Sequence, residues 1–434
     1  MKGYFVVNFL RMIFSKMRMN HYSAVKSTDP EVASAIVGEM RRQEDGLEMI
    51  ASENYASEAV IEALGTVFTN KYSEGYPGRR YYGGQEFTDI VETLAIDRAK
   101  KLFGAEHANV QPLSGASANI SAYCALLAPG DTILGMDLSH GGHLTHGSPV
   151  TYMSQIFRFV RYKTEADGAI DYEKLEALAE QEKPKLLLAG FSSYTRQIDY
   201  EKFTAIGKRR GIVTMMDMAH IAGLVAAGVV PNPVEYFDIV TTTTHKTLRG
   251  PRGGMILCRE PFAKAIDKAV FPGVQGGPHM NVIASKAVAF HEALLPSFQK
   301  YAQQMLLNAK ALEHAFVERG YMILFGKTEN HMILVDVYGT LGVSGKEAEI
   351  LLDEIGITVN KNMIPDDARS PMDPSGIRIG VPAVTTRGMK ESEIRMIATW
   401  MDEALRSKGD AHTLKSLRDH VRTLCEKFPL YGEL

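Results

Sequence analysis

The sequence predicts an α/β protein with a large domain built on a mostly parallel sheet and a smaller α+β domain after it. Between about residues 50 and 280, short apolar runs alternate with helical stretches, a pattern typical of a parallel sheet covered on both faces. Beyond that point long helices come first and strand-like runs follow. A length of 434 residues is enough for two or three domains.

The N-terminal part is expected to differ from the rest. Residues 1–28 are basic and contain no acid before Asp29, so they predict a disordered extension, with a transit segment as the alternative. Asp29 and Pro30 have the pattern of a helix start, cap and first turn. Residues 29–49 are therefore expected to form a helical arm.

The large domain is expected at 50–280 and the small one at 281–434. In the large domain we expect strands at 108–111, 132–136, 156–162, 185–189, 212–216, 238–242 and 254–258. Helices are expected there at 86–103, 117–127, 172–181 and 200–209. In the small domain we expect helices at 281–294, 297–319, 344–354, 390–408 and 411–427, and strands at 321–325, 331–337 and 358–360.

Composition excludes several classes of protein. The 48 basic and 51 acidic residues leave a net charge of −3, which argues against a general nucleic-acid binder or a membrane-surface protein. No apolar run reaches 18 residues, so no transmembrane helix is expected. The 3 cysteines lie far apart without a CxxC pair, which suits a reducing compartment and predicts a cytoplasmic protein.

Two titratable side chains stand where neighbouring expected strands end. Asp217 comes directly after the run 212–216, and Lys246 comes four residues after the run 238–242. Ligands of open α/β sheets bind at the carboxyl ends of strands. Lys246 could be a surface lysine and Asp217 a helix cap. Alternatively, Lys246 is a Schiff-base lysine, and Asp217 pairs with the protonated ring nitrogen of pyridoxal phosphate.

Small residues at 114–119 open a helix directly after an expected strand, as in sites where a helix N-terminus binds phosphate. Taken with Lys246 and Asp217, this segment makes a pyridoxal phosphate site the most economical interpretation. The His-rich segment 140–147 has a spacing that could suggest zinc. Because it contains no Cys or carboxylate, we expect no metal and favour His143 stacking on the cofactor ring.

Two further segments carry candidate groups. The stretch 70–84 is rich in Gly, Tyr and Arg, and Glu74 within it could act as an acid–base group beside Tyr72 and Tyr82; a packed subunit contact is the alternative. Arg378 stands between glycines in an apolar run, which suits bidentate capture of a carboxylate, with a surface salt bridge as the alternative.

Taken together, these motifs closely resemble serine hydroxymethyltransferases. The resemblance runs in the correct order from about residue 29 to 430 and is carried by the segments 50–54, 74–84, 140–147, 217–220, 241–248 and 375–378. It implies a fold-type I pyridoxal phosphate enzyme that is active as a homodimer or a pair of dimers. The implied reaction transfers the hydroxymethyl carbon of serine to tetrahydrofolate and leaves glycine.

The resemblance also implies a role for each matching residue. Lys246 would hold the cofactor, Asp217 its ring nitrogen and His143 its ring face. The other cofactor contacts would be Ser114, Gly115, Ala116, Ser192, His220, Thr243 and His245, with Tyr72 and Gly277 from the other subunit. Serine would be bound by Ser52, Tyr82 and Arg378, and the folate by Glu74, Leu138, Gly142, Leu144 and Asn362, with Glu74 also moving protons.

Four positions depart from the commonest family pattern: Leu113, Ser117, Val274 and Val381. None of them is a reacting group, so the departures bear on phosphate and interface contacts and not on the chemistry. Two other functions stay open at this point, a folate-independent aldolase of the same fold and an inactive binding protein.

Overall fold

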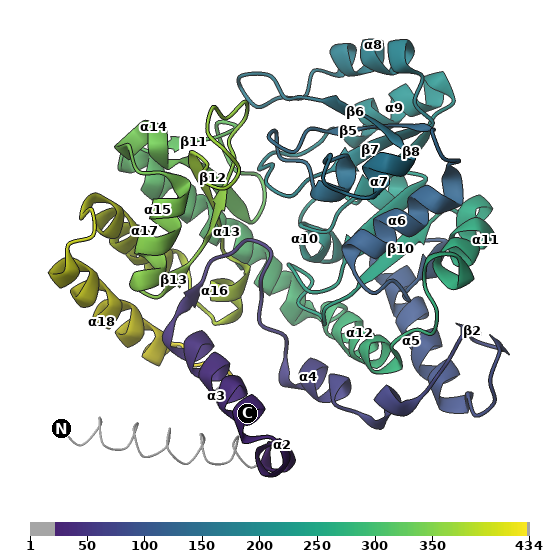
Figure 1. Cartoon of the computed structure of the whole chain (residues 1–434), viewed down its shortest axis with the longest axis horizontal. Coiled ribbons are helices and arrows are strands. Elements are labelled where there is room, and N and C mark those ends of the chain that lie inside the picture. Colours follow the sequence, from purple (N-terminus) through teal and green to yellow (C-terminus); the bar gives the residue numbers. More distant parts are fainter. Residues whose placement is uncertain (1–21, 432–434) are drawn as a thin grey trace.

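The computed structural model describes residues 22–431. Its larger body, on the right in Figure 1, is built on a seven-stranded sheet in the order β4-β10-β9-β8-β7-β5-β6. From β9 to β6 all neighbours are parallel, and only β10 runs antiparallel to both of its neighbours. The prediction of a mostly parallel sheet is confirmed. The strands are β4 His107–Asn109, β5 Thr132–Met136, β6 Arg158–Tyr162, β7 Leu186–Gly190, β8 Val213–Asp217, β9 Ile239–Thr243 and β10 Gly254–Cys258.

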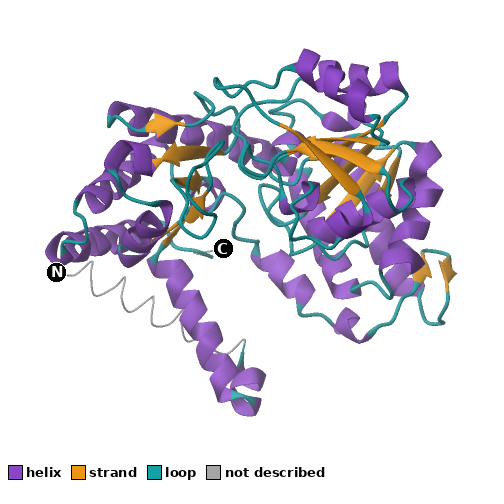
Figure 2. Cartoon of the chain, turned by 45° about the horizontal axis from the view of Figure 1, so that its top comes forward, coloured by secondary structure: helices purple, strands orange, loops and turns teal. Residues whose placement is uncertain are grey.

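Helices pack around this sheet (Figure 2). They are α5 Glu86–Phe103, α6 Gly115–Leu126, α7 Met153–Ile156, α8 Tyr172–Glu182, α9 Tyr200–Arg210, α10 Ala222–Ala226 and α11 Glu260–Lys268. The helix α4 (Glu58–Leu64) lies farther out and packs against α12 (Met280–Ala293). All five residues of β7 are buried, as expected for a strand covered on both faces. The strand expected from residue 156 starts later, because Ile156 closes α7.

A second, smaller body follows along the chain. Its four-stranded sheet has the order β11-β12-β15-β14, with every pair antiparallel. The strands are β11 Met322–Ile323, β12 Met332–Asp336, β14 Asn360–Asn362 and β15 Gly376–Gly380. The helices are α13 Pro296–Glu318, α14 Val337–Leu341, α15 Gly345–Glu354, α16 Pro382–Thr386, α17 Glu391–Arg406 and α18 Ala411–Lys427.

The N-terminal arm joins the small body. The helix α3 (Pro30–Asp45) is capped by the Asp29 side chain, as expected, and the strand β1 (Leu47–Glu48) after it pairs in parallel with β13 (Ile357–Thr358). The single strand expected at 358–360 is therefore divided between β13 and β14.

The domain limits stay predictions. The helix α12 (Met280–Ala293), which begins at the expected boundary, packs against α5 and α4 of the large body. Of the extension expected at 1–28, residues 1–21 lie outside the described residues, whereas α2 (Ser23–Thr28) forms a short helix with no buried residue. Within residues 22–431, no helix has the length and hydrophobicity needed to cross a membrane.

Candidate functional site

The sheet brings Asp217 and Lys246 to one edge. Asp217 is the last residue of β8, and Lys246 follows the end of the adjacent parallel strand β9 by three residues. Both side chains are buried. The carboxyl ends of these two strands therefore form the floor of the candidate site, as the sequence predicts.

Asp217 is held as an anion by its neighbours. Its Oδ2 accepts a hydrogen bond from Asn119 Nδ2 at 2.8 Å and lies 3.1 Å from His146 Nε2, and its Oδ1 accepts from the backbone N–H of Ala219. Burial acts to raise the pKa of this carboxyl, but the contact with His146 and the hydrogen bond from Asn119 hold it well below its ordinary value. A buried carboxylate of this kind suits a protonated ring nitrogen.

Lys246 carries a buried amine without a partner. Among residues 22–431, Nζ of Lys246 forms no hydrogen bond or ion pair. Burial lowers the pKa of this amine to about 8, although Asp217 acts in the opposite direction. A desolvated lysine with a lowered pKa is the form that reacts with carbonyl groups, because a fraction of it is neutral near pH 7.

His143 lies beside Asp217 and is neutral. Its Nδ1 lies 2.8 Å from Thr145 Oγ1, and burial lowers the pKa of the ring to about 4. Ligand atoms of His143, His146 and Asp217 lie within 4.8 Å of one another, close enough for a metal, but two of the three residues are already in mutual contact. The absence of a metal stays a prediction.

Arg378 reaches the site from the small body. It lies on β15 and donates to Asn360 Oδ1 through Nε and to Ser192 O and Oγ through one terminal nitrogen, at 3.0, 2.7 and 3.1 Å. The other terminal nitrogen has only a 3.5 Å contact with Ser52 Oγ. Burial lowers the pKa of Arg378 to about 10, and no ion pair with a carboxylate forms in the described part of the chain.

The segment 114–119 opens a helix, as expected, and its contact with a phosphate stays a prediction. Ser114 caps the 12-residue helix α6, and Ser117 closes a capping box with it. A Cβ on Gly115 would lie 2.7 Å from Thr243 Cγ2, and a Cβ on Gly254 would lie 2.3 Å from Ser114 O. The first N–H groups of α6 have no acceptor within the helix and can bind an anion, and the lack of a side chain at Gly254 lets its strand pack against the start of the helix.

Two buried histidines stack beside Lys246 and Arg378. The rings of His220 and His331 lie 5.5 Å apart at an angle of 18°. Burial lowers the pKa of His220 well below its ordinary value and that of His331 to about 3, so both rings are neutral. Burial also lowers the pKa of His245, to about 3.

A separate cluster consists of Tyr72, Glu74, Tyr82 and Gly277. The family resemblance implies that Tyr72 and Gly277 contact the cofactor of the other subunit and that Glu74 moves protons. The rings of Tyr72 and Tyr82 are 5.4 Å apart, and the side chain of Tyr72 lies against Gly277. The Glu74 carboxylate raises the pKa of Tyr72. Tyr72 and Tyr82 are about half exposed. Within residues 22–431, no hydrogen bond, ion pair or ring contact joins this cluster to Lys246.

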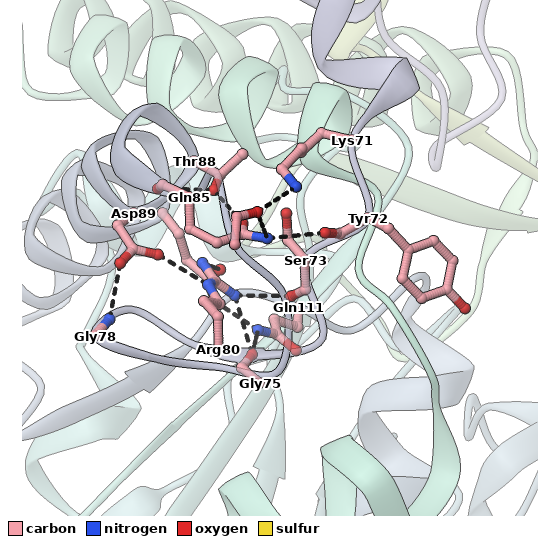
Figure 3. Close-up of polar contacts among 12 residues, drawn as sticks. Lys71, Tyr72, Ser73, Gly75, Gly78, Arg80, Gln85, Thr88, Asp89 and Gln111 are labelled. Carbon is pink, nitrogen blue, oxygen red and sulfur yellow. Dashed lines mark hydrogen bonds and ion pairs between the residues drawn. The ribbon is translucent and has the colours of Figure 1, made fainter.

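Arg80 fixes the backbone of this cluster (Figure 3). Its buried guanidinium binds Asp89 at 2.8 Å and Glu92 at 2.6 Å and donates to the carbonyls of Ser73 and Gly75. The side chain of Tyr72 points away from this network (Figure 3). The segment therefore presents Tyr72 on a rigid backbone.

The residues expected around folate are partly exposed. Leu138 and Leu144 are exposed, and Asn362 is half-buried. Gly142 is buried, and a Cβ at this position would lie 2.3 Å from the carbonyl oxygen of Met136. Their contact with folate stays a prediction.

Sequence reasoning missed several groups that orient the site. They are Asn119 and His146 on Asp217, Asn360 on Arg378, and His331 on His220. Asn119 lies inside the phosphate segment, so its position could have suggested a role. His146 lies inside the His-rich segment 140–147, so it too was within reach, whereas Asn360 and His331 could be found only from the folded structure.

Comparison with known proteins identifies the family of this chain. The sequence model of the family described as serine hydroxymethyltransferase matches residues 25–401. A serine hydroxymethyltransferase of Koribacter versatilis is 55% identical over 411 residues, which is 94% of this chain and 96% of that protein. One of Acidobacterium capsulatum is 55% identical over 412 residues, covering 95% and 96%. This chain belongs to the serine hydroxymethyltransferase family.

Proposed function

We propose that the groups around Lys246 are the site at which this chain carries out the reaction of its family. That reaction is the reversible transfer of the serine hydroxymethyl carbon to tetrahydrofolate, which gives glycine and 5,10-methylenetetrahydrofolate with pyridoxal phosphate as cofactor. The observation that carries the assignment is the combination of Lys246, a buried amine without a partner, with Arg378, a buried cation without an anion.

The residues fit the cofactor at three points. Lys246 would bond to its aldehyde, Asp217 would hold a proton on its ring nitrogen, and the first turn of α6 would bind its phosphate. Neutral His143 would lie flat against the ring. When bound, the cofactor accepts electron density from a breaking bond at Cα of the amino acid.

Arg378 binds and orients the substrate. The two N–H groups of its lightly used terminal nitrogen, together with Ser52 Oγ, suit the carboxylate of serine. By fixing the carboxylate, Arg378 would select which bond to Cα of the amino acid can break. Because Ser192 and Asn360 already hold the guanidinium in place, the Arg378 side chain loses little conformational freedom when serine binds.

Glu74 completes the proposed chemistry from a second subunit. We propose a homodimer in which the cluster of Tyr72, Glu74, Tyr82 and Gly277 reaches into the partner's site, with Glu74 moving the proton of the substrate hydroxyl. Two observations support the proposal. Tyr72 and Tyr82 are exposed, and within residues 22–431 no hydrogen bond, ion pair or ring contact joins the cluster to Lys246. We also propose a cytoplasmic location, which the thiols of Cys124 and Cys258 suit, since neither forms a disulfide in the described residues.

The substitution Lys246→Ala tests the site. The variant should lose both steady turnover of serine and the visible absorbance of protein-bound cofactor, while Lys202→Ala, which changes an exposed lysine, should keep both. Normal multiple turnover by the Lys246 variant would contradict the assignment. Wild-type serine cleavage that does not depend on tetrahydrofolate would indicate an aldolase.

A mixing experiment tests the shared site. Glu74→Gln and Lys246→Ala proteins, each inactive alone, are unfolded together and refolded. A mixed dimer has one site with both changes and one with neither, so up to about a quarter of the wild-type activity should return. No recovery, with mixed dimers demonstrated by mass, would contradict sharing of the site.

A further inference from the structure

Lys286 is a charged side chain that the proposed mechanism does not use. It lies on α12, and only 1% of its surface is exposed. Its Nζ donates to the carbonyls of Val110, Pro112 and Gly254 at 2.7, 3.0 and 2.8 Å. The three acceptors match the three N–H bonds of an ammonium group. All donors of Lys286 are therefore occupied by backbone carbonyls, and none is left for a ligand.

These three carbonyls surround the phosphate segment. Val110 and Pro112 lie between the end of β4 and Ser114, and Gly254 begins β10. The Gly254 N–H donates to Pro112 O at 3.0 Å, and Gly254 packs against the carbonyl of Ser114. Lys286 therefore joins the two backbone segments whose close approach shapes the first turn of α6.

The charge of Lys286 is not balanced by a bonded carboxylate in the described residues. Glu92 of α5 is the anion that raises its pKa, but Glu92 is already bonded to Arg80 and Gln111. The pKa of His245 is lowered mainly by burial, and the charge of Lys286 adds to this lowering. Burial lowers the pKa of Lys286 to about 7. An anion bound nearby would favour the charged form.

We propose that Lys286 is a positioning residue for the cofactor phosphate, holding the segment 110–114 against Gly254 and placing a positive charge behind the phosphate site. This inference rests on the proposed position of the phosphate at α6. It predicts that Lys286 affects binding of the phosphate specifically and binding of the rest of the cofactor little.

The test compares cofactors with and without phosphate. The cofactor-free protein is titrated with pyridoxal phosphate and with pyridoxal, for the wild type, Lys286→Met and Lys286→Gln. We expect both variants to bind pyridoxal phosphate roughly 10- to 100-fold more weakly, the range known for outer-shell partners of metal sites, and to bind pyridoxal nearly as the wild type does. Lys286→Gln retains hydrogen-bond donors but not the charge, and it is the test variant if the Met variant does not fold.

Ser285→Ala is the matched control. Ser285 is buried next to Lys286 and donates to the carbonyl of Val60 at 2.7 Å, which tethers α4 and not the phosphate segment. Its loss should leave the ratio of the two affinities unchanged. A second readout is the rise in melting temperature of the cofactor-free protein with inorganic phosphate, which the Lys286 variants should lose.

The outcomes separate two failures. If the wild type prefers pyridoxal phosphate to pyridoxal and the Lys286 variants keep that preference, the role of Lys286 is wrong. An equal weakening of both cofactors would also refute it, because it would show general damage. If the wild type itself shows no preference for the phosphorylated cofactor, the proposed phosphate site is wrong.

Discussion

Replacing Arg378 tests how this protein recognises its amino acid. Three of the five N–H groups of Arg378 are committed to Asn360 and Ser192, and the remaining two have only one long contact, with Ser52. We expect those two groups to bind the serine carboxylate. Arg378→Ala should therefore weaken serine binding far more than cofactor binding.

The magnitude follows from burial. Truncating one partner of a buried, hydrogen-bonded charge pair costs about 2–5 kcal/mol, which corresponds to a KM for serine raised roughly 30- to 4000-fold. Arg378→Lys should fall between the wild type and the Ala variant, because a lysine keeps the charge without the planar pair of donors. The Ala variant should also lose the rise in melting temperature that serine produces in the wild type.

Initial rates at varied serine concentration, with tetrahydrofolate saturating, measure this effect. The visible absorbance of bound cofactor shows whether each variant still holds it, which separates loss of substrate binding from loss of the site. An Arg378→Ala protein that retains its cofactor and has an unchanged KM for serine would refute the carboxylate role.

Three further predictions follow from the same geometry. The rate at which cofactor-free protein takes up pyridoxal phosphate should rise with pH up to about 8 and then level off, because Lys246, with its pKa lowered to about 8, must be neutral to react; a flat stopped-flow profile would contradict this. Asp217→Asn removes the anion at the ring nitrogen and should lower kcat by about 10²–10³-fold, and a loss below tenfold in steady-state assays would count against that role. Gly115→Ala places a Cβ 2.7 Å from Thr243 Cγ2 and should weaken cofactor binding, whereas Gly104→Ala, where a Cβ meets no atom within 4 Å, should cost stability alone; equal cofactor affinity of both variants in titrations would refute the reasoning.

Strands were predictable where burial is continuous. The run 254–258 matches β10 residue for residue, and the run at 185–189 differs from β7 by one residue at each end. The antiparallel direction of β10 was not predictable, because its five buried residues carry no sign of direction. The N-terminal limit of β6 was missed because the apolar Ile156 suits a strand and a helix equally well.

The proposed reacting groups were more predictable than the groups that orient them. Lys246 and Asp217 follow expected apolar strands in the sequence, which made them candidates, and segment 114–119 together with the family resemblance then favoured a cofactor role over a surface lysine and a helix cap. Asn360 and Arg378, which are bonded to each other, lie on paired strands whose register a single sequence does not reveal. Lys286 looks like an ordinary helix residue, because α12 is apolar around much of its surface and only the fold shows which carbonyls meet it.

The balance of charge connects these findings. A net charge of −3 gives no general attraction for anions, yet phosphate, carboxylate and folate are all anionic. Lys246, Lys286 and Arg378 are each buried, and in residues 22–431 none of them forms an ion pair with a carboxylate. Buried cations of this kind destabilise a protein until an anion compensates them. Cofactor and serine should therefore stabilise the fold as they bind, because each supplies a counter-charge that the chain itself does not.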